Sequence, residues 1–418
     1  MPAPLRALRA AGIVVGLAAL TAPASAQPRP KPGRYKVGPL YVTPRLDVRN
    51  AGVDTNVFQT LTDEVQDTVL IISPRLDGGM VVGRRLRLSG FGLVDINYYR
   101  TQGNEGSTDF FGGGDAELDL GPFTFLGGGG GGQASQRFSI DIDERLLRQE
   151  KYAYAGVAWR AEERLSLRVV GRTEVAQFAP GVFRLGGFVQ EAMDRHTLSG
   201  RAEVRYALTN RTALLASAEG FEDRFFSQPT NSPHPIRDSF RYLAGFEFER
   251  PALLSGRLLA GVRDFSGPLA KGSPSYTGPA ILADLVIPIR NRMRLHGAAL
   301  RDVRHASSLV DIDDLRYRNA FVSSSYQGDV SFDLPLELIG VVSGGFEEAR
   351  YLLPYPYPDR NHLANRTDHR WTAGAGLLRR FGGQVRIGGH VDWARRVSTL
   401  PFFSYEGLRF GLTAEVLP

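Results

Sequence analysis

Apolar and polar residues alternate with a period of two along most of the chain after residue 37. In the segment 198–208, one face carries Leu, Gly, Ala, Val, Tyr and Leu, whereas the other carries Ser, Arg, Glu, Arg and Ala. The segments 165–172, 240–249 and 384–393 alternate in the same way. Because successive side chains of a strand point to opposite faces, the pattern predicts strands with one apolar and one polar face.

The connections between these segments alternate in length. Short turns are expected near 83–85, 121–122, 162–164, 209–211, 250–251, 289–292, 334–336 and 382–383. Longer polar connections are expected near 51–66, 102–107, 139–147, 179–194, 227–236, 265–274, 305–317, 352–367 and 398–403. Eight turns interleaved with nine long connections imply 18 strands. An even number of strands with short turns at one end and long loops at the other is typical of bacterial outer-membrane barrels.

The sequence therefore predicts an all-β fold: one transmembrane antiparallel β-barrel of about 18 strands, with 16 as the alternative. A soluble β-sandwich also alternates, but its strands average only about 5–6 residues. Here the segments run to about 12–16 residues, and most polar faces carry charges of both signs. Lipid offers the backbone no hydrogen-bond partner, so such a sheet must close on itself.

The N-terminus has the pattern of an export signal. Arg6 and Arg9 precede an apolar run over 10–20, and Ala24-Ser25-Ala26 forms a small-residue cleavage site. We predict a signal peptide over 1–26, a Pro-rich periplasmic tail over 27–37 and the barrel over 38–418. An even strand number places both termini in the periplasm of a Gram-negative bacterium, with the barrel in its outer membrane.

Composition narrows the function. Cysteine is absent, which excludes disulfide frameworks, thiolate metal sites and cysteine nucleophiles. The net charge is +6, and the first 26 residues hold two arginines and no acid, so 48 basic and 44 acidic residues remain. A balance of +4, dispersed along the chain, does not suit a nucleic-acid-binding protein.

Aromatic residues near the strand ends suit a girdle at the membrane interfaces. They are Tyr98, Tyr99, Phe110, Phe178, Phe225, Phe226, Tyr351, Trp371 and Trp393. The last segment alternates from Leu408 to Val416 as a closing strand would, although the chain ends in Pro418 rather than an aromatic residue. The expected partners are outer-membrane lipid, lipopolysaccharide and, during biogenesis, the barrel-assembly machinery.

Short motifs open the mature chain in a fixed order: YVTPRLD at 41–47, DTNVF at 54–58, Asp67, and SPRL at 73–76. This order resembles the outer-membrane β-barrel porin family associated with exopolysaccharide and capsule loci. The resemblance implies a passive or export-associated channel with no catalytic site to transfer, and polysaccharide-export components as possible partners. From the residues alone, 54–56 is expected to form a turn in the first outer loop.

Other candidate motifs favour structural roles. The glycine runs at 112–114 and 127–132 lack the Lys-Ser/Thr of a phosphate loop, so they predict kinks or close backbone approach. The seven histidines show no metal-site spacing, and no cofactor is expected. An outer-membrane hydrolase remains an alternative class, but no local motif provides its nucleophile and base.

Two acidic clusters fall in predicted outer loops. Asp141 and Asp143 belong to the first, and Asp311 and Asp313 belong to the second. Their oxygens are hard ligands that suit Ca²⁺, but the spacing of an EF-hand is missing. They are weak metal-site candidates, with solvated loop carboxylates as the alternative.

Charged residues on the polar faces are the candidate permeation residues. They are Arg168, Arg172, Glu174, Arg201, Glu203, Arg205, Arg241, Arg386, His390, Asp392, Asp115, Glu117 and Asp119. The arginines would form a basic strip and Asp115 to Asp119 an acidic wall, unless these charges pair with one another. We predict a porin-like channel for small polar or anionic solutes, or one that assists surface-polysaccharide export. The alternatives are a plugged barrel with a structural or export role, and the hydrolase.

Overall fold

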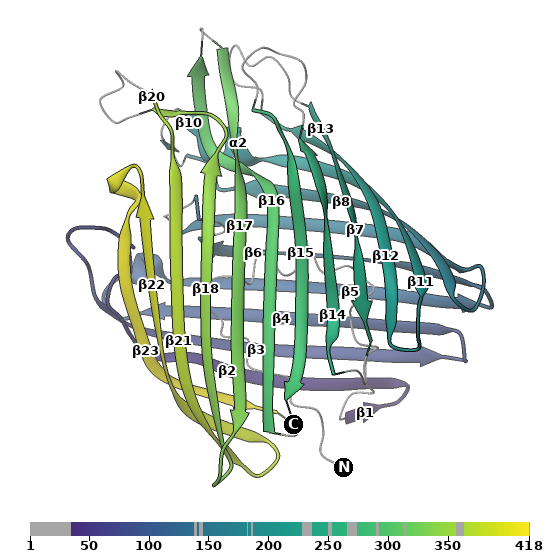
Figure 1. The fold of residues 1–418 in the computed structure, drawn as a ribbon. Helices are drawn as coiled ribbons and strands as arrows, with labels where there is room; N and C mark the ends of the chain where they lie inside the picture. Colours follow the sequence, from purple (N-terminus) through teal and green to yellow (C-terminus); the bar gives the residue numbers. More distant parts are fainter. Residues whose placement is uncertain are drawn as a thin grey trace.

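The protein is a closed antiparallel β-barrel of 18 strands, with one further short strand at its edge (Figure 1). The computed structural model describes residues 35–417 except 138–139, 142–144, 182, 185–186, 228–235, 250–252, 266–273, 290–291, 313–314, 357–362. The predicted signal peptide therefore lies outside the described residues. The all-β barrel and its strand number are confirmed.

The barrel strands follow one another around the ring in chain order. They are β2 (Leu40–Asp54), β3 (Asp67–Val82), β4 (Leu86–Tyr99), β5 (Ser107–Leu120), β6 (Phe123–Gln136), β7 (Leu146–Arg160), β8 (Leu165–Phe178), β11 (Arg195–Ala207), β12 (Thr212–Phe225), β13 (Ile236–Phe248), β14 (Ser255–Phe265), β15 (Tyr276–Ile289), β16 (Met293–Ile312), β17 (Leu315–Asp333), β18 (Leu338–Tyr351), β21 (Thr367–Phe381), β22 (Val385–Ser398) and β23 (Tyr405–Val416). The ring closes where β2 pairs with β23.

The remaining elements lie at the two ends of the barrel. They are β1 (Tyr35–Val37), η1 (Gly103–Glu105), β9 (Phe183–Arg184), β10 (Gly187–Phe188), α2 (Val189–Met193), β19 (Tyr355–Pro356), β20 (Leu363–Ala364) and η3 (Pro401–Phe403). In the part of the chain described, no helix is long and apolar enough to cross a membrane.

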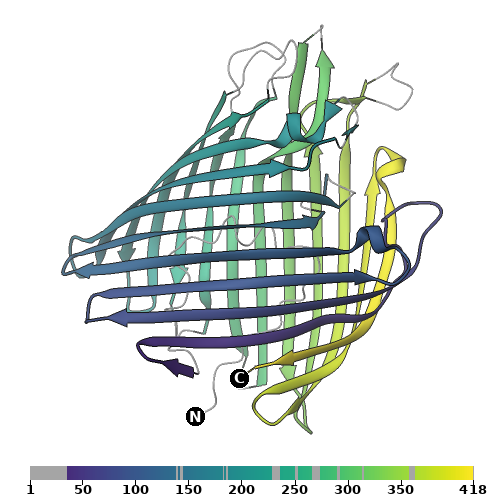
Figure 2. The same cartoon turned by 180° about the vertical axis from the view of Figure 1, so that it is seen from behind.

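Strand β1 consists of the last three residues assigned to the periplasmic tail. β2 begins to pair with β23 only at Leu46, which lies opposite Val416, so the first residues of β2 extend beyond the end of β23. β1 pairs with this extension, at Leu40–Val42. An unpaired strand edge exposes a row of backbone donors and acceptors. β1 therefore covers the free edge at the seam of the barrel, beside the C-terminus (Figure 2).

The short turns lie at one end of the barrel, and the long connections lie at the other (Figure 2). The turn between β5 and β6 consists of Gly121 and Pro122, and Gly121 has φ = 68°. Positive φ is the conformation that the first position of a type II′ hairpin turn requires, and glycine adopts it without strain.

One predicted loop is a hairpin instead. The segment 305–317 continues β16 and β17 as a ladder beyond the rim, with a register shift between His305 and Leu309. Much of the segment is polar in sequence, yet Ser307, Leu309 and Tyr317 are almost fully buried. Buried backbone must have hydrogen-bond partners, which explains why this stretch is strand rather than loop.

The prediction of an aromatic girdle is only partly correct. Tyr98, Phe110, Phe226 and Trp371 are exposed, whereas Tyr99, Phe178, Phe225 and Tyr351 are buried. Adjacent residues of a strand face opposite sides, so Tyr98 and Tyr99 cannot both face lipid. The buried aromatics lie at the end of the barrel that carries the long connections.

Candidate functional site: the lumen and the strap across its mouth

Alternating exposure separates the two faces of the barrel wall. On β11, Leu198, Val204 and Tyr206 are 50%, 43% and 44% exposed, whereas Glu203 is 8% exposed. Ion pairs between strands that are not neighbours, such as Arg241 of β13 with Asp302 of β16, form on the less exposed face. The concave side of the ring brings non-neighbouring strands together, so this face lines the lumen.

All thirteen candidate permeation residues occupy inward positions. They are Arg168, Arg172, Glu174, Arg201, Glu203, Arg205, Arg241, Arg386, His390, Asp392, Asp115, Glu117 and Asp119. The alternation of the sequence was sufficient to place them. Their role in permeation stays a prediction.

The arginines of the predicted basic strip are paired with acids. Glu219 accepts from Arg201 at 3.0 Å and from Arg241 at 2.5 Å. Arg205 lies 2.8 Å from Glu247. The predicted basic strip would attract anions only if the acidic residues lay elsewhere in the ring. Instead, acids are interleaved with the arginines, which lowers the field that a passing anion would meet.

The same pairing recurs elsewhere in the lumen. Arg172 and Glu174 lie 3.0 Å apart, and Arg168 is directly opposite Glu203 in the β8–β11 register. Arg386 contacts Glu415 at 2.7 Å. On the acidic side, Arg87 contacts Glu117 at 3.1 Å and Asp119 at 2.5 Å, and Asp115 accepts a hydrogen bond from Tyr154. His390 and Asp392 lie 3.6 Å apart.

Two sides of the lumen differ in net charge even though most of their charges are paired. Among the described side chains, the inward positions of β8 and β11–β14 carry eight arginines and five acids. They are Arg168, Arg172, Arg195, Arg201, Arg205, Arg241, Arg257, Arg263, Glu174, Glu203, Glu219, Asp223 and Glu247. Those of β2–β5 carry four arginines and nine acids: Arg45, Arg49, Arg75, Arg87, Asp47, Asp54, Asp67, Asp77, Asp95, Asp109, Asp115, Glu117 and Asp119. We call these the basic wall and the acidic wall.

The connection between β6 and β7 crosses the mouth of the barrel. Four of its residues, Arg137, Ile140, Asp141 and Arg145, are described, and we call these four residues the strap. Asp141 contacts β16 and β18, and each of these strands lies eight positions from β6 around the ring of 18. Partners that lie opposite one another on a ring can be joined only across its opening.

Asp141 holds the strap to the far wall. It accepts hydrogen bonds from the backbone N–H and hydroxyl of Ser307, both at 2.5 Å. It also accepts from the Tyr351 hydroxyl at 2.5 Å and from Arg366 at 3.3 Å. The residue is 1% exposed. A buried carboxylate is stable when its lone pairs are filled in this way. Asp141 is therefore an anchor and not the solvated or Ca²⁺-binding loop acid expected from sequence.

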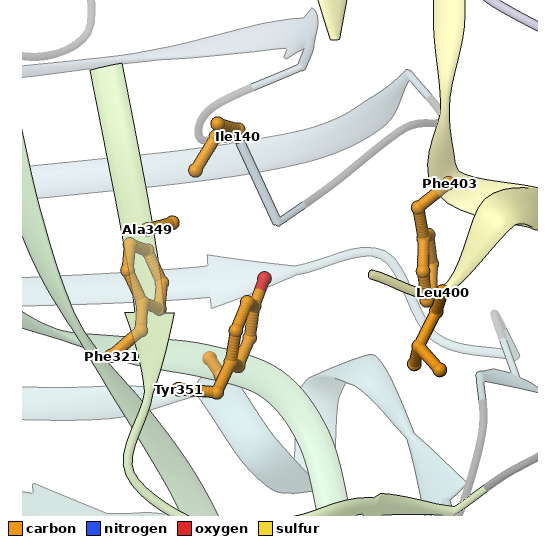
Figure 3. Packing of buried hydrophobic residues seen from close by; sticks show 7 residues of the cluster. Ile140, Phe321, Ala349, Tyr351, Leu400 and Phe403 are labelled. Carbon is orange, nitrogen blue, oxygen red and sulfur yellow. The ribbon is translucent and has the colours of Figure 1, made fainter. Parts of the chain in front are cut away.

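An apolar cluster surrounds the anchor. Figure 3 shows Ile140 of the strap among side chains from the opposite wall and from η3. The cluster consists of Ile140, Ala306, Phe321, Ala349, Tyr351, Leu400 and Phe403. Its burial offsets the cost of ordering a loop across water.

Buried ions complete the far anchorage. Arg366 is fully buried, lies 2.8 Å from Asp368 and stacks between the rings of Tyr351 and Phe403 at 4.3 and 3.5 Å. Arg396 contacts the same carboxylate at 2.7 Å. The sequence did not single out these residues. Arg366 lies in a connection, where no periodicity signals burial, and the alternation of β21 and β22 does not reveal that Asp368 and Arg396 pair with each other.

At its near end the strap is tied to the adjoining loops. Arg137 donates to the backbone carbonyl of Val57 at 2.9 Å. Arg145 lies 3.4 Å from Glu105, and its guanidinium is 4.8 Å from the ring centroid of Tyr99. The strap is thus held at both ends.

A second inward element comes from the β8–β11 connection. Val189, Ala192 and Met193 of α2 are buried against Leu146, Phe178 and Leu309. Arg318 of β17 donates to the Glu191 carbonyl at 3.1 Å. Burial raises the pKa of Asp194, whose carboxylate accepts from the Phe178 N–H at 2.7 Å. The extended β16–β17 hairpin therefore supports both α2 and the strap.

The other candidate metal ligands lie outside the described side chains. Asp143 and Asp313 lie outside the described residues, as does the side chain of Asp311. Among the residues that the structure describes, no group of three or more His, Cys, Asp or Glu side chains could hold a metal ion.

Comparisons with known proteins describe the barrel only. No protein-family model and no curated protein sequence matches the chain. Among solved structures, OpdO of Pseudomonas aeruginosa aligns with a TM-score of 0.48 at 13% identity, over 90% of this chain and 97% of that chain. OccK1 (OpdK) of the same species aligns at 0.47 and 12%, over 91% and 98%. The siderophore receptor PirA of that species aligns at 0.43 and 8%, over 90% and 80%. Likeness at this level carries no argument about function.

Proposed function

We propose that the chain is an outer-membrane channel that passes small polar solutes through a lumen narrowed by the strap. The observation that carries the proposal is the closed ring with an apolar outward face and a charged inward face. Lipid favours the first face, and water favours the second. Barrels of 16–18 strands are wide enough to leave an aqueous channel.

The strap and α2 decide how wide that channel is. Both are fixed by buried contacts rather than by solvated ones, so the narrowing is a built feature of the mouth. The basic wall carries more arginines than acids and the acidic wall more acids than arginines, so the two walls support a field across the lumen that orients polar solutes, with anions favoured only along the basic wall.

Reconstitution in planar bilayers tests the proposal. The purified protein should show heat-modifiable gel mobility, a β-rich circular dichroism spectrum in detergent and discrete conductance steps. Solubility without detergent or a helical spectrum would exclude the membrane barrel. Tags at 352–367 should be reached from outside intact cells, and tags at 289–292 should not be.

A plugged barrel with a structural or export role is the second candidate. The anchorage of the strap at both ends favours it, because a fixed strap together with α2 can fill a mouth. Barrels that insert correctly but never conduct would support this candidate, and a gene neighbourhood devoted to surface polysaccharide would support the export role. Lipase or protease activity in a silent barrel would instead favour the hydrolase.

A further inference from the structure

Glycines form the floor of an aromatic surface on the lumen wall between β4 and β7. In the register, Phe91 lies opposite Gly113, which lies opposite Gly130, which lies opposite Tyr152. A methyl group on Gly113 or on Gly130 would lie 3.0 Å from the Tyr152 hydroxyl. The Tyr152 side chain therefore crosses β6 and reaches β5. It lies along the wall instead of standing in the lumen.

The neighbouring rows repeat the arrangement. The Tyr154 side chain crosses Gly128 and donates its hydroxyl hydrogen to Asp115 on β5. A methyl group on Gly128 would lie 2.9 Å from that hydroxyl. One on Gly132 would lie 2.8 Å from the Phe111 ring. Glycine in a strand marks a place where another group approaches closely, and here that group is an aromatic ring. We call Phe91, Phe111, Tyr152 and Tyr154 the aromatic platform.

Planar charged groups border the platform. The Arg172 guanidinium lies 4.8 Å from the Tyr152 ring centroid and bonds to Glu174 at 3.0 Å. On the other side, Arg75 lies 5.4 Å from the Phe91 ring centroid and is bidentate to Asp77. These groups offer paired donors and paired acceptors beside flat apolar faces.

We propose that the aromatic platform binds the pyranose rings of an oligosaccharide in the lumen. A β-glucopyranose ring has C–H bonds on both faces and hydroxyl pairs around its edge. Its faces match flat aromatic rings, and its hydroxyls match Asp115, Glu174 and the two arginines. Arg75 is paired with Asp77 and Arg172 with Glu174, while Asp115 adds a negative charge beside Tyr154. These surroundings disfavour an anionic ligand and suit an uncharged sugar. This inference rests on the proposed function only in requiring that solute enters the lumen.

Saturation-transfer NMR on the whole protein in detergent tests the inference without any measurement of current. With cellotetraose as the probe, irradiation of aromatic protons should transfer saturation to the ring C–H protons. Sorbitol, a polyol without a pyranose face, should receive none. Transfer to indole but not to cellotetraose would overturn the proposal in favour of an aromatic ligand, and transfer to neither would overturn it entirely. Sugar binding without any conductance would contradict the proposed channel but would leave the proposed sugar site standing.

A variant pair locates the site. Tyr152→Leu with Tyr154→Leu keeps apolar cover on the glycines but removes the flat faces, and should weaken cellotetraose binding about tenfold. The matched control is Phe221→Leu on β12, whose ring lies beneath Arg263 at 4.4 Å. It should bind cellotetraose as the native protein does. Equal loss in both variants would contradict the assignment, and if the double variant fails to fold, the transfer experiment on the native protein still decides.

Discussion

The mouth of the barrel and the middle of its lumen are held together by different kinds of contact. At the mouth, Asp141 and Arg366 are almost fully buried, and they are 225 residues apart in sequence. In the lumen, Arg172 and Glu174 are two residues apart and keep 27% and 13% exposure. A buried charge that loses its partner is costly, whereas a wet pair contributes little. Single substitutions should therefore have a large effect at the mouth and a small effect at partly exposed lumen pairs such as Arg172 with Glu174. The buried Arg241, which pairs with Glu219 and Asp302, should resemble the mouth.

Asp141→Ala should have the largest effect. It leaves the hydroxyl of Tyr351 and the N–H of Ser307 without their acceptor, and removing one member of a buried charged set costs about 3–5 kcal/mol. The strap should leave the far wall, so single-channel conductance should rise and thermal stability in detergent should fall.

Asp77→Ala is the matched control for that variant. Asp77 pairs with Arg75 on the lumen wall and is 32% exposed, so its loss should cost about 0–1 kcal/mol. Equal effects of the two substitutions would remove the distinction between mouth and lumen.

Arg318→Ala should have an intermediate effect that is centred on α2 and on the end of β12. Its guanidinium donates to the carbonyls of Glu191 and Ser227 and lies 4.2 Å from the Phe225 ring centroid. Hydrogen bonds from a charged donor contribute about 1.5–3 kcal/mol, so amide exchange over 189–194 should accelerate. Arg350→Ala, which removes an exposed pair with Glu348, should leave that exchange unchanged.

Replacement of Arg168, Arg172, Arg201 and Arg205 by Ser should have the smallest effect. Because acids already oppose these arginines, the reversal potential in a salt gradient should move only slightly towards cations, with the fold intact. Glu117→Gln with Asp119→Asn on the acidic wall should move it the other way. If neither set moves the reversal potential, the lumen charges are structural partners only.

The wall could be predicted from the sequence because its determinants are local. Alternation fixes which residues face inward, and turn chemistry fixes where strands reverse, so the strand number and the inward position of Arg201 or Asp115 followed directly. The partner of each inward charge did not follow, since Glu219 and Asp302 reach their arginines across strands. The register of the strands and the curvature of the ring bring these charges together, and the alternation of the sequence reveals neither.

The mouth could not be predicted for a physical reason. Its contacts join segments that are far apart in the chain, and loop residues carry no periodicity to reveal burial. Asp141 has the sequence context of a solvated loop acid, and 305–317 has that of a polar loop. Both interpretations were wrong because burial supplied partners that lie on the other side of the ring. The glycine runs at 112–114 and 127–132 did give a signal, that of close approach to the backbone.

Cysteine cross-linking tests the central claim most directly, because the native chain contains no cysteine. Ile140→Cys on the strap and Ala349→Cys on β18 belong to one buried cluster at the mouth. The folded protein should form this cross-link in high yield, whereas Ile140→Cys with Ala202→Cys, on the outward face of β11, should not. A cross-link yield for the Ile140–Ala349 pair no higher than that of the control pair would contradict a strap that spans the barrel.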